Sequence, residues 1–180
     1  MSLIGTTLLK DIIMRSDIHE PAAVLYALDE RVHSTLNRNQ GSDQANDGMD
    51  LIVCEINTET FLVKIASAMR PFIVHQNDAC KLYKGSRASI GGQFLENKTF
   101  ETKEFQLSKG DTIYMFSDGY SDQFGGPAGK RMKMNRLQNI LDDIQIRDMA
   151  EQHRVIKENF ELWKGPYRQL DDVLLIGVKI

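Results

Sequence analysis

Hydrophobic residues follow a helical period from the start of the chain to about residue 37. Within residues 3–15 (LIGTTLLKDIIMR), the leucines and isoleucines gather on one side of a helix. Pro21 suits the first turn of a second helix, in which apolar residues recur at spacings of three and four up to about Asn37. Residues 38–48 are polar and contain glycine, so we expect a loop there.

The pattern then changes to that of β-strands. Residues 49–56 and 61–67 are rich in β-branched residues, and the polar residues 57–60 between them indicate a hairpin. Residues 85–98 contain three glycines and indicate a loop. Further short apolar or alternating runs predict strands at 72–75, 80–84, 99–107 and 111–116.

The last third of the chain predicts two more helices and a closing strand. The helices are expected at 132–143 and 146–163, and the strand at 172–180. Consecutive hairpin-like strands with helices before and after them indicate antiparallel sheets. We therefore predict a layered α+β domain, without internal repeats or low-complexity segments.

Composition narrows the classes of function. The 180 residues are about the size of one domain, 26% of them are charged, and the net charge is −3. A mildly acidic chain is a poor match for nucleic acid, whose phosphates attract clustered lysine and arginine. No apolar run approaches the roughly 18 residues that a membrane span needs, and the first residues lack the basic region of a secretory signal. We therefore expect a cytoplasmic protein with neither nucleic acid nor a membrane as partner.

Cysteine and histidine give no sign of a metal site or a disulfide framework. Cys54 and Cys80 are too few for such a framework, and no Cys–His metal spacing occurs. The four histidines are scattered, at positions 19, 33, 75 and 153. We interpret them as ordinary surface or core residues.

The first candidate for chemistry is the sequence SDGYSD at residues 117–122, which directly follows an apolar strand. A strand end is a rigid platform, and Gly119 lets the backbone turn tightly beside a ligand. Asp118 is therefore well placed to bind a hard cation, with Asp122 near the site. The alternative is that Asp-Gly is only a turn, in which Asp118 bonds its own backbone.

The second candidate is the sequence QLDDVLLI at residues 169–176. Asp171 and Asp172 open the last predicted strand, where two adjacent carboxylates repel each other unless a cation or hydrogen-bond donors meet them. The alternative is a solvated strand start. Together with Asp118, they form an oxygen-only ligand set from distant strand ends, which suits Mg²⁺ or Mn²⁺ better than zinc.

The third candidate is the glycine-rich loop FGGPAGKR at residues 124–131, which ends in positive charge. Lys130 and the basic residues after it could meet a phosphorylated partner. A solvated loop before a helix is the simpler alternative. The loop is not a P-loop, because Arg131 stands where that motif has serine or threonine.

These segments resemble the SpoIIE-like branch of the metal-dependent (PPM, type-2C) protein serine phosphatases. Residues 110–126 are similar to the stretch that ends in the third metal motif of that family, and residues 169–180 to its closing metal-binding strand. Weaker similarity covers residues 1–9, 48–51 and 66–71. The resemblance thus runs along nearly the whole chain.

The resemblance implies an α-β-β-α layered sandwich with antiparallel sheets, in which Asp118 and the Asp171–Asp172 pair are metal ligands. It also implies two Mn²⁺ or Mg²⁺ ions that bridge a water, and this water attacks a phosphoserine or phosphothreonine in line. The implied substrate is a phosphorylated anti-sigma-factor antagonist, as in the partner switching that regulates sigma factors.

The resemblance is incomplete near the N-terminus. The family has a Gly-Asp strand motif and an Asp-x-x-Gly-His-Gly motif there, whereas no His-Gly pair occurs in this sequence. We therefore expect residues 1–180 to form a single partial domain that lacks the N-terminal strands and half of the carboxylates. Such a chain should have negligible phosphatase activity. Its open sheet edges would favour self-association, for example as a homodimer.

Two other interpretations compete with the enzyme. One is a binding module with a degenerate phosphatase fold, which docks a partner without catalysis. The other is a receiver domain with an acidic pocket. It fits poorly, because receivers carry their acidic pair on the first strand of a parallel sheet, whereas Asp171 and Asp172 precede the last strand.

Overall fold

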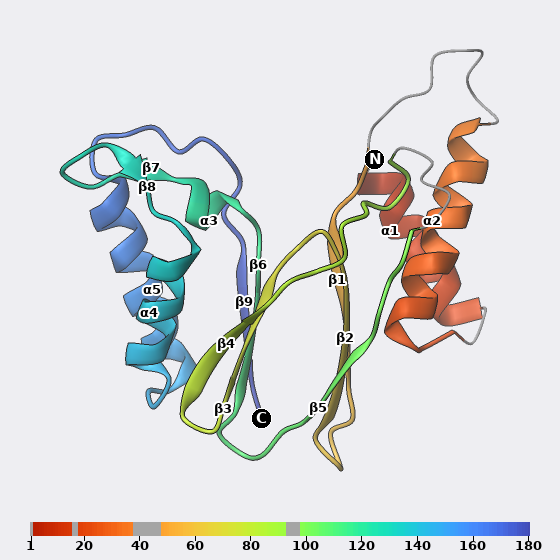
Figure 1. The fold of residues 1–180 in the computed structure, drawn as a ribbon, viewed down its shortest axis with the longest axis horizontal. Helices are drawn as coiled ribbons and strands as arrows, with labels where there is room; N and C mark the ends of the chain where they lie inside the picture. The colour runs from red at the N-terminus through yellow and green to blue at the C-terminus, as the bar shows by residue number, and fades with distance from the viewer. Residues whose placement is uncertain (1, 16–17, 38–47, 93–97) are drawn as a thin grey trace. The chain divides into compact units, whose positions relative to one another are not determined.

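The computed structural model describes residues 2–15, 18–37, 48–92 and 98–180. The chain divides into two compact units, the first formed by Met1–Arg70 with Lys84–Gln106, the second by Pro71–Tyr83 with Leu107–Ile180. In each unit, helices pack on an antiparallel sheet (Figure 1), which confirms the predicted α+β class. That both units belong to one partial catalytic domain stays a prediction. Most of the predicted loop at 38–48 lies outside the described residues.

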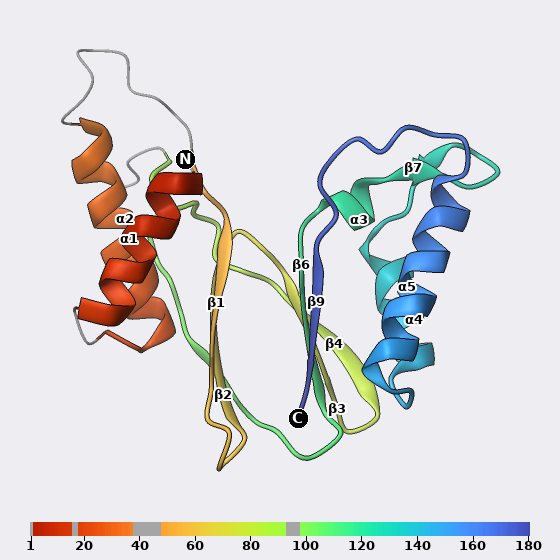
Figure 2. The same cartoon turned by 180° about the vertical axis from the view of Figure 1, so that it is seen from behind.

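The first unit begins with the two predicted helices, α1 (Ser2–Arg15) and α2 (Pro21–Asn37). Its sheet has the order β1-β2-β5 and contains β1 (Leu51–Ile56), β2 (Leu62–Ala68) and β5 (Lys103–Gln106). Both strand pairs are antiparallel. Figures 1 and 2 show α2 running beside β1 and β2.

The predicted β1–β2 hairpin is confirmed. The Asn57 side-chain oxygen accepts hydrogen bonds from the backbone N–H groups of Glu59 and Thr60, at 3.0 and 2.9 Å. This is the local pairing by which asparagine favours a turn. Phe61 completes the reversal with φ of 57°, although only a few per cent of non-glycine residues have positive φ.

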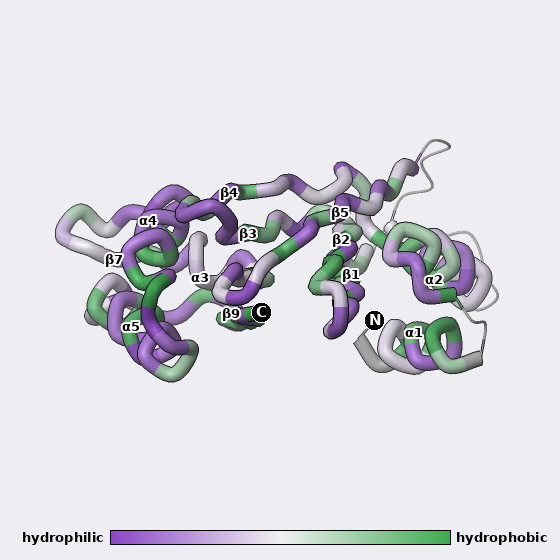
Figure 3. Tube along the Cα trace, turned by 90° about the horizontal axis from the view of Figure 1, so that it is seen from below, coloured by the Kyte–Doolittle hydropathy of each residue, from purple (hydrophilic) through white to green (hydrophobic). Residues whose placement is uncertain are grey.

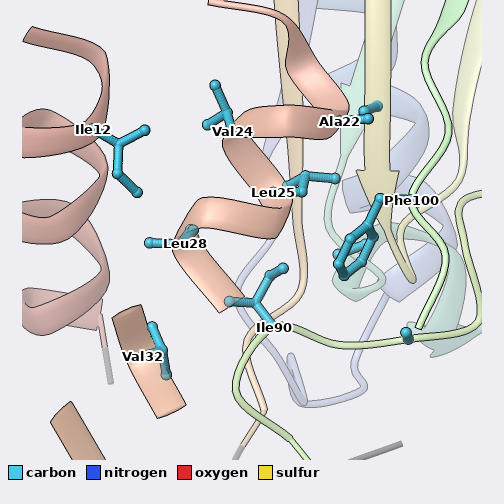
Figure 4. Packing of buried hydrophobic residues seen from close by; sticks show 11 residues of the cluster. Ile12, Ala22, Val24, Leu25, Leu28, Val32, Ile90 and Phe100 are labelled. Carbon is cyan, nitrogen blue, oxygen red and sulfur yellow. The ribbon is translucent and has the colours of Figure 1, made fainter. Parts of the chain in front are cut away.

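The core of the first unit contains the apolar face predicted for α2 and part of that predicted for α1, where Ile12 is buried but Ile13 is 41% exposed. Ile12 of α1 and Leu25 and Leu28 of α2 are fully buried, and Figure 4 shows them among Val24, Val32, Ile90 and Phe100. The period of three and four residues along α2 produces this stripe, because it matches the helical repeat. Ala66 and Ala68 of β2 close the cluster from the sheet.

A buried ion pair also stabilises the first unit. The Asp29 carboxylate on α2 accepts hydrogen bonds from Gly91 N–H at 2.7 Å and Lys98 Nζ at 2.8 Å. Lys98 also donates to the carbonyl of Ser89 at 3.0 Å, and its side chain is only 8% exposed. The pair therefore links α2 to Ser89, Gly91 and Lys98.

The predicted strand at 99–107 is shorter than expected. Only Lys103–Gln106 form β5, because the residues before them bond to α2 rather than to a strand. Phe100 N–H donates to the Tyr26 hydroxyl at 3.0 Å, and Ala22 N–H donates to Thr102 Oγ1 at 3.0 Å. The backbone N–H of Phe100, used in this way, is not available to a sheet, and the Thr102 side chain ties the same stretch to α2.

The second unit has a four-stranded antiparallel sheet of order β4-β3-β6-β9. Its strands are β3 (Phe72–Gln76), β4 (Ala79–Tyr83), β6 (Thr112–Phe116) and β9 (Leu175–Lys179). The predicted closing strand thus starts later than expected. Within the described residues, β9 pairs with β6 alone and is therefore an edge strand of this sheet. Self-association of the chain through such sheet edges stays a prediction.

Two long helices pack on this sheet, α4 (Met134–Ile144) and α5 (Met149–Lys164). Their amphipathic character is visible in Figure 3 as alternating hydrophobic and hydrophilic stretches. Asp148 caps α5, since its side chain accepts a hydrogen bond from Glu151 N–H at 2.8 Å. No helix in the described part of the chain has the length and apolar character that crossing a membrane requires.

Three short elements lie between β6 and α4, and none of them was predicted. They are the single turn α3 (Gly119–Asp122) and the two-residue strands β7 (Phe124–Gly125) and β8 (Lys130–Arg131), which pair antiparallel. Such short elements leave almost no periodic pattern in a sequence. They fold because α5 supports them, as described below.

Candidate metal centre

The segment after β6 and the segment before β9 meet at one end of the sheet. Ser117 makes three hydrogen bonds across this junction: its backbone N–H donates to the carbonyl of Leu174 at 3.0 Å, its Oγ donates to the carbonyl of Asp172 at 2.8 Å, and the same Oγ accepts from Leu174 N–H at 2.9 Å. A single side chain thus fixes the segment that carries the acidic pair.

Gly119 brings the two segments closer still. A Cβ atom on Gly119 would lie 2.4 Å from the carbonyl oxygen of Asp172 and 3.3 Å from that of Asp171. Only a residue without a side chain allows this approach of two backbones. Because Ser117 and Gly119 both contact Asp172, the backbone of Asp118 lies beside the acidic pair.

Asp118 is half-buried at the start of α3. Its carbonyl accepts hydrogen bonds from Asp122 N–H at 2.9 Å and Ser121 Oγ at 3.1 Å, which closes the turn. Its carboxylate does not cap α3. Whether the Asp118 carboxylate binds an ion or only bonds its own backbone stays a prediction.

Asp171 and Asp172 are both exposed and lie before β9 rather than within it. The two carboxylates therefore do not open the strand, and they lie in a solvated segment before it, close to the alternative of a solvated strand start. Asp171 accepts a hydrogen bond from Asp172 N–H at 2.7 Å through one carboxylate oxygen. Its carbonyl accepts from Gln169 Nε2 at 2.9 Å. Whether the three carboxylates converge on one ion stays a prediction.

The donor chemistry at this junction fits a hard divalent cation. Carboxylate oxygens and backbone carbonyls are the ligands that Mg²⁺ and Mn²⁺ prefer. Among the described residues, however, no group of three or more His, Cys, Asp or Glu side chains is placed to hold a metal ion. That Asp118, Asp171 and Asp172 are metal ligands stays a prediction.

Asp122 is the last residue of α3, and Lys130 belongs to β8 of the β7–β8 hairpin. Asp122 is exposed and forms an ion pair with Arg131 at 3.5 Å. Lys130, also exposed, is paired with Gly125 in the hairpin register. That these two residues act beside a metal site stays a prediction.

Trp163 holds this hairpin in place, a role that the sequence analysis did not predict. Its Nε1 donates to the carbonyl of Gln123 at 3.0 Å, and its own carbonyl accepts from Gly126 N–H at 2.7 Å. A Cβ on Gly125 would lie 1.8 Å from the Trp163 carbonyl oxygen, so the two backbones are in direct contact. The lone tryptophan and the Gly-Gly pair were the available signals.

A cavity of about 650 Å³ lies between α5 and residues 169–177 of the second unit. Tyr114 and Tyr120 form part of its wall, and burial raises the pKa of each phenol to about 12. Their hydroxyls are satisfied within the unit, by Gln152 Oε1 at 2.8 Å and the Ile156 carbonyl at 3.0 Å. They therefore act as structural groups.

The chain is similar to known proteins in its sequence and in its fold. Residues 3–180 match the family model for stage II sporulation protein E (SpoIIE). No curated protein sequence matches the chain. Among solved structures, the chain is similar to the SiaA-PP2C domain of Pseudomonas aeruginosa, with a TM-score of 0.85 and 21% identity over 99% of this chain and 67% of that one.

Two further structures are similar over almost the whole chain. The phosphatase domain of SpoIIE from Bacillus subtilis, presoaked with Mn, has a TM-score of 0.58 and 19% identity over 98% of this chain and 73% of that one. The RsbU and RsbW domains of a Mycobacterium tuberculosis protein give 0.69 and 20% over 99% of this chain and 46% of that one. At such low identities, the likeness establishes the fold, which is that of PP2C-type domains.

Proposed function

This chain belongs to the SpoIIE family of PPM-type protein serine/threonine phosphatases, and from this premise we propose that its acidic junction serves metal-dependent removal of phosphate from a regulatory protein. The observation that carries the proposal is the contact of Ser117 and Gly119 with Asp172, which sets Asp118 beside the acidic pair. The reaction is hydrolysis of a phosphoserine or phosphothreonine ester. The implied cofactor is Mn²⁺ or Mg²⁺.

Each part of the junction has a role in this proposal. Two divalent ions, when bound, would polarise the phosphoryl group and lower the pKa of an attacking water. Asp118 and Asp171 would hold such ions, with Asp172 as the alternative ligand of the pair. The short bonds of Ser117 would keep the two ligand segments in register. Precise placement of ligands matters because small displacements lower catalytic rates strongly.

The substrate class is inferred from the named neighbours. Both SpoIIE and the RsbU–RsbW protein are similar to this chain in fold. We infer a phosphorylated anti-sigma-factor antagonist as the partner, in a system that switches a sigma factor by phosphorylation. A cytoplasmic location accompanies this inference, because sigma factors act there.

Binding of Mn²⁺ to the isolated chain tests the metal site directly. Paramagnetic Mn²⁺ should broaden the amide NMR signals of residues 117–119 and 171–173 together. The substitutions Asp118→Asn and Asp171→Asn should each weaken this effect, whereas the exposed control Asp143→Asn on α4 should not. Broadening confined to other parts of the chain would refute the shared site.

A catalytic assay separates the enzyme from the rival binding module. The described residues bring together fewer ligands than a two-metal site uses, so we propose that the 180-residue chain binds a phosphorylated partner but releases little phosphate. Mn²⁺-dependent phosphate release at a rate ordinary for this class of enzyme would disprove this inactivity. Binding without Mn²⁺ dependence, unaffected by Asp118→Asn, would favour the binding module.

A further inference from the structure

We propose that a cluster of four basic residues beside α3 docks acidic residues that flank the phosphoserine of the substrate protein. This basic surface consists of Lys130, Arg131, Lys133 and Arg136, all of which are exposed. The inference rests on the proposed function, because it concerns the sequence around the phosphate that the site would remove. It specifies what the partner must present next to the phosphoserine.

The local charge differs sharply from that of the whole chain. The net charge of the protein is −3, yet no acidic residue occurs between Asp122 and Asp142, a stretch that contains all four cations. Concentrated charge of one sign attracts and orients a partner of the other sign. The favoured partner is therefore an acidic segment.

Hydrogen bonds fix the basic surface next to the metal-ligand segment. Lys133 N–H donates to the carbonyl of Ser121 at 2.8 Å, and Met132 N–H donates to that of Gln123 at 3.0 Å. Ser121 belongs to α3, the single turn that Asp118 begins. Because one helical turn rises about 5.4 Å, the basic surface begins roughly that far from Asp118.

Two of the cations are held in place by aromatic rings. The Arg136 guanidinium lies 4.4 Å from the centre of the Trp163 ring, and that of Arg131 lies 5.6 Å from the centre of the Phe124 ring. Stacking on a ring leaves the edge of the guanidinium able to bind a carboxylate. These side chains thus lose less freedom on binding than an unsupported arginine would.

The surface has little internal neutralisation. Arg131 and Asp122 are 3.5 Å apart with side chains 57% and 50% exposed, a kind of pair that contributes little in water. Lys130 and Lys133 have no carboxylate partner among the described residues. Lys133 also has φ of 68° and ψ of 153°, a conformation that favours glycine. Glycine would adopt this conformation with less strain, yet position 133 carries a cation.

These positions define where the acidic residues should be. An extended peptide advances about 3.3 Å per residue, so a carboxylate two to four positions from the phosphoserine would reach the surface. The preferred substrate therefore carries Asp or Glu within about four residues of the phosphorylated side chain on one side.

The test compares two fluorescent phosphoserine peptides, one with acidic and one with neutral flanks, by anisotropy in the presence of Mn²⁺. The chain should bind the acidic peptide about fivefold more tightly, and this preference should shrink as salt is raised from about 50 to about 200 mM. The double variant Lys130→Glu/Lys133→Glu should lose it. The control Lys109→Glu/Lys157→Glu, exposed residues with the same change in net charge, should retain it.

Several outcomes would overturn the inference. Equal binding of both peptides by the unmodified chain would do so, as would a preference that persists in the Lys130→Glu/Lys133→Glu variant with a normal far-UV circular dichroism spectrum. Equally tight binding of single-stranded DNA would show a general polyanion surface instead. Binding of an unphosphorylated acidic peptide measures docking on the basic surface without the metal site. Absence of Mn²⁺ binding would refute the proposed function, and this result is distinguishable from a failure of the peptide to dock.

Discussion

Removing the buried carboxylate of Asp29 should destabilise the first unit strongly. In Asp29→Ala, the Lys98 ammonium loses its only carboxylate partner among the described residues and keeps the Ser89 carbonyl at 3.0 Å and His33 Nε2 at 3.4 Å, while Gly91 N–H loses its acceptor. Breaking a buried ion pair by removing one partner costs about 3–5 kcal/mol. Since the Asp29 side chain is 16% exposed, some water reaches the site, and we expect a loss of about 3 kcal/mol.

Urea unfolding followed by far-UV circular dichroism measures this loss. For a chain of this size, about 3 kcal/mol lowers Tm by roughly 6–12 °C. The neighbouring exposed residue provides a matched control, since Glu30→Gln should change stability by less than about 0.5 kcal/mol.

A double variant tests the physical reason. Asp29→Leu/Lys98→Met leaves no unpaired charge, so it should be less destabilised than the sum of its single changes. Additive losses, or an Asp29→Ala variant as stable as the Glu30→Gln control, would show that the ion pair does not stabilise the unit.

Three further predictions concern the second unit and the thiols. Ser117→Ala should speed hydrogen exchange at Leu174 N–H and lower stability by about 1–2 kcal/mol, whereas Ser108→Ala, at the other end of β6, should do neither. His75 is 4% exposed and has no hydrogen-bond partner for either ring nitrogen among the described residues, so His75→Leu should raise Tm by about 2–4 °C, and a lowered Tm would contradict this. Burial, with Glu55 beside it, raises the pKa of the Cys54 thiol to about 11, so alkylation at about pH 8 should be slow and should accelerate as pH rises toward that pKa. Fast labelling of Cys54 near neutral pH would disprove the burial.

Local pattern determined the elements whose side chains repeat with a clear period. The stripe along α2 gave the helix and its buried face, because Leu25, Leu28 and Val32 occupy one side whatever lies opposite them. The β1–β2 hairpin followed from β-branched runs around a polar turn. The candidate residues Asp118 and Asp171 were identified in the same way, from the residue types next to strand ends.

Only the tertiary structure showed what surrounds those residues. Ser117 and Asp172 are 55 positions apart, and the bond between them exists because β6 and β9 pair in one register. The turn α3 and the β7–β8 hairpin are too short for a periodic signal, and they depend on contacts with Trp163 from α5. Local propensity is encoded in neighbouring residues, whereas close approach of distant backbones depends on the packing of the whole unit, which no short window of the sequence contains.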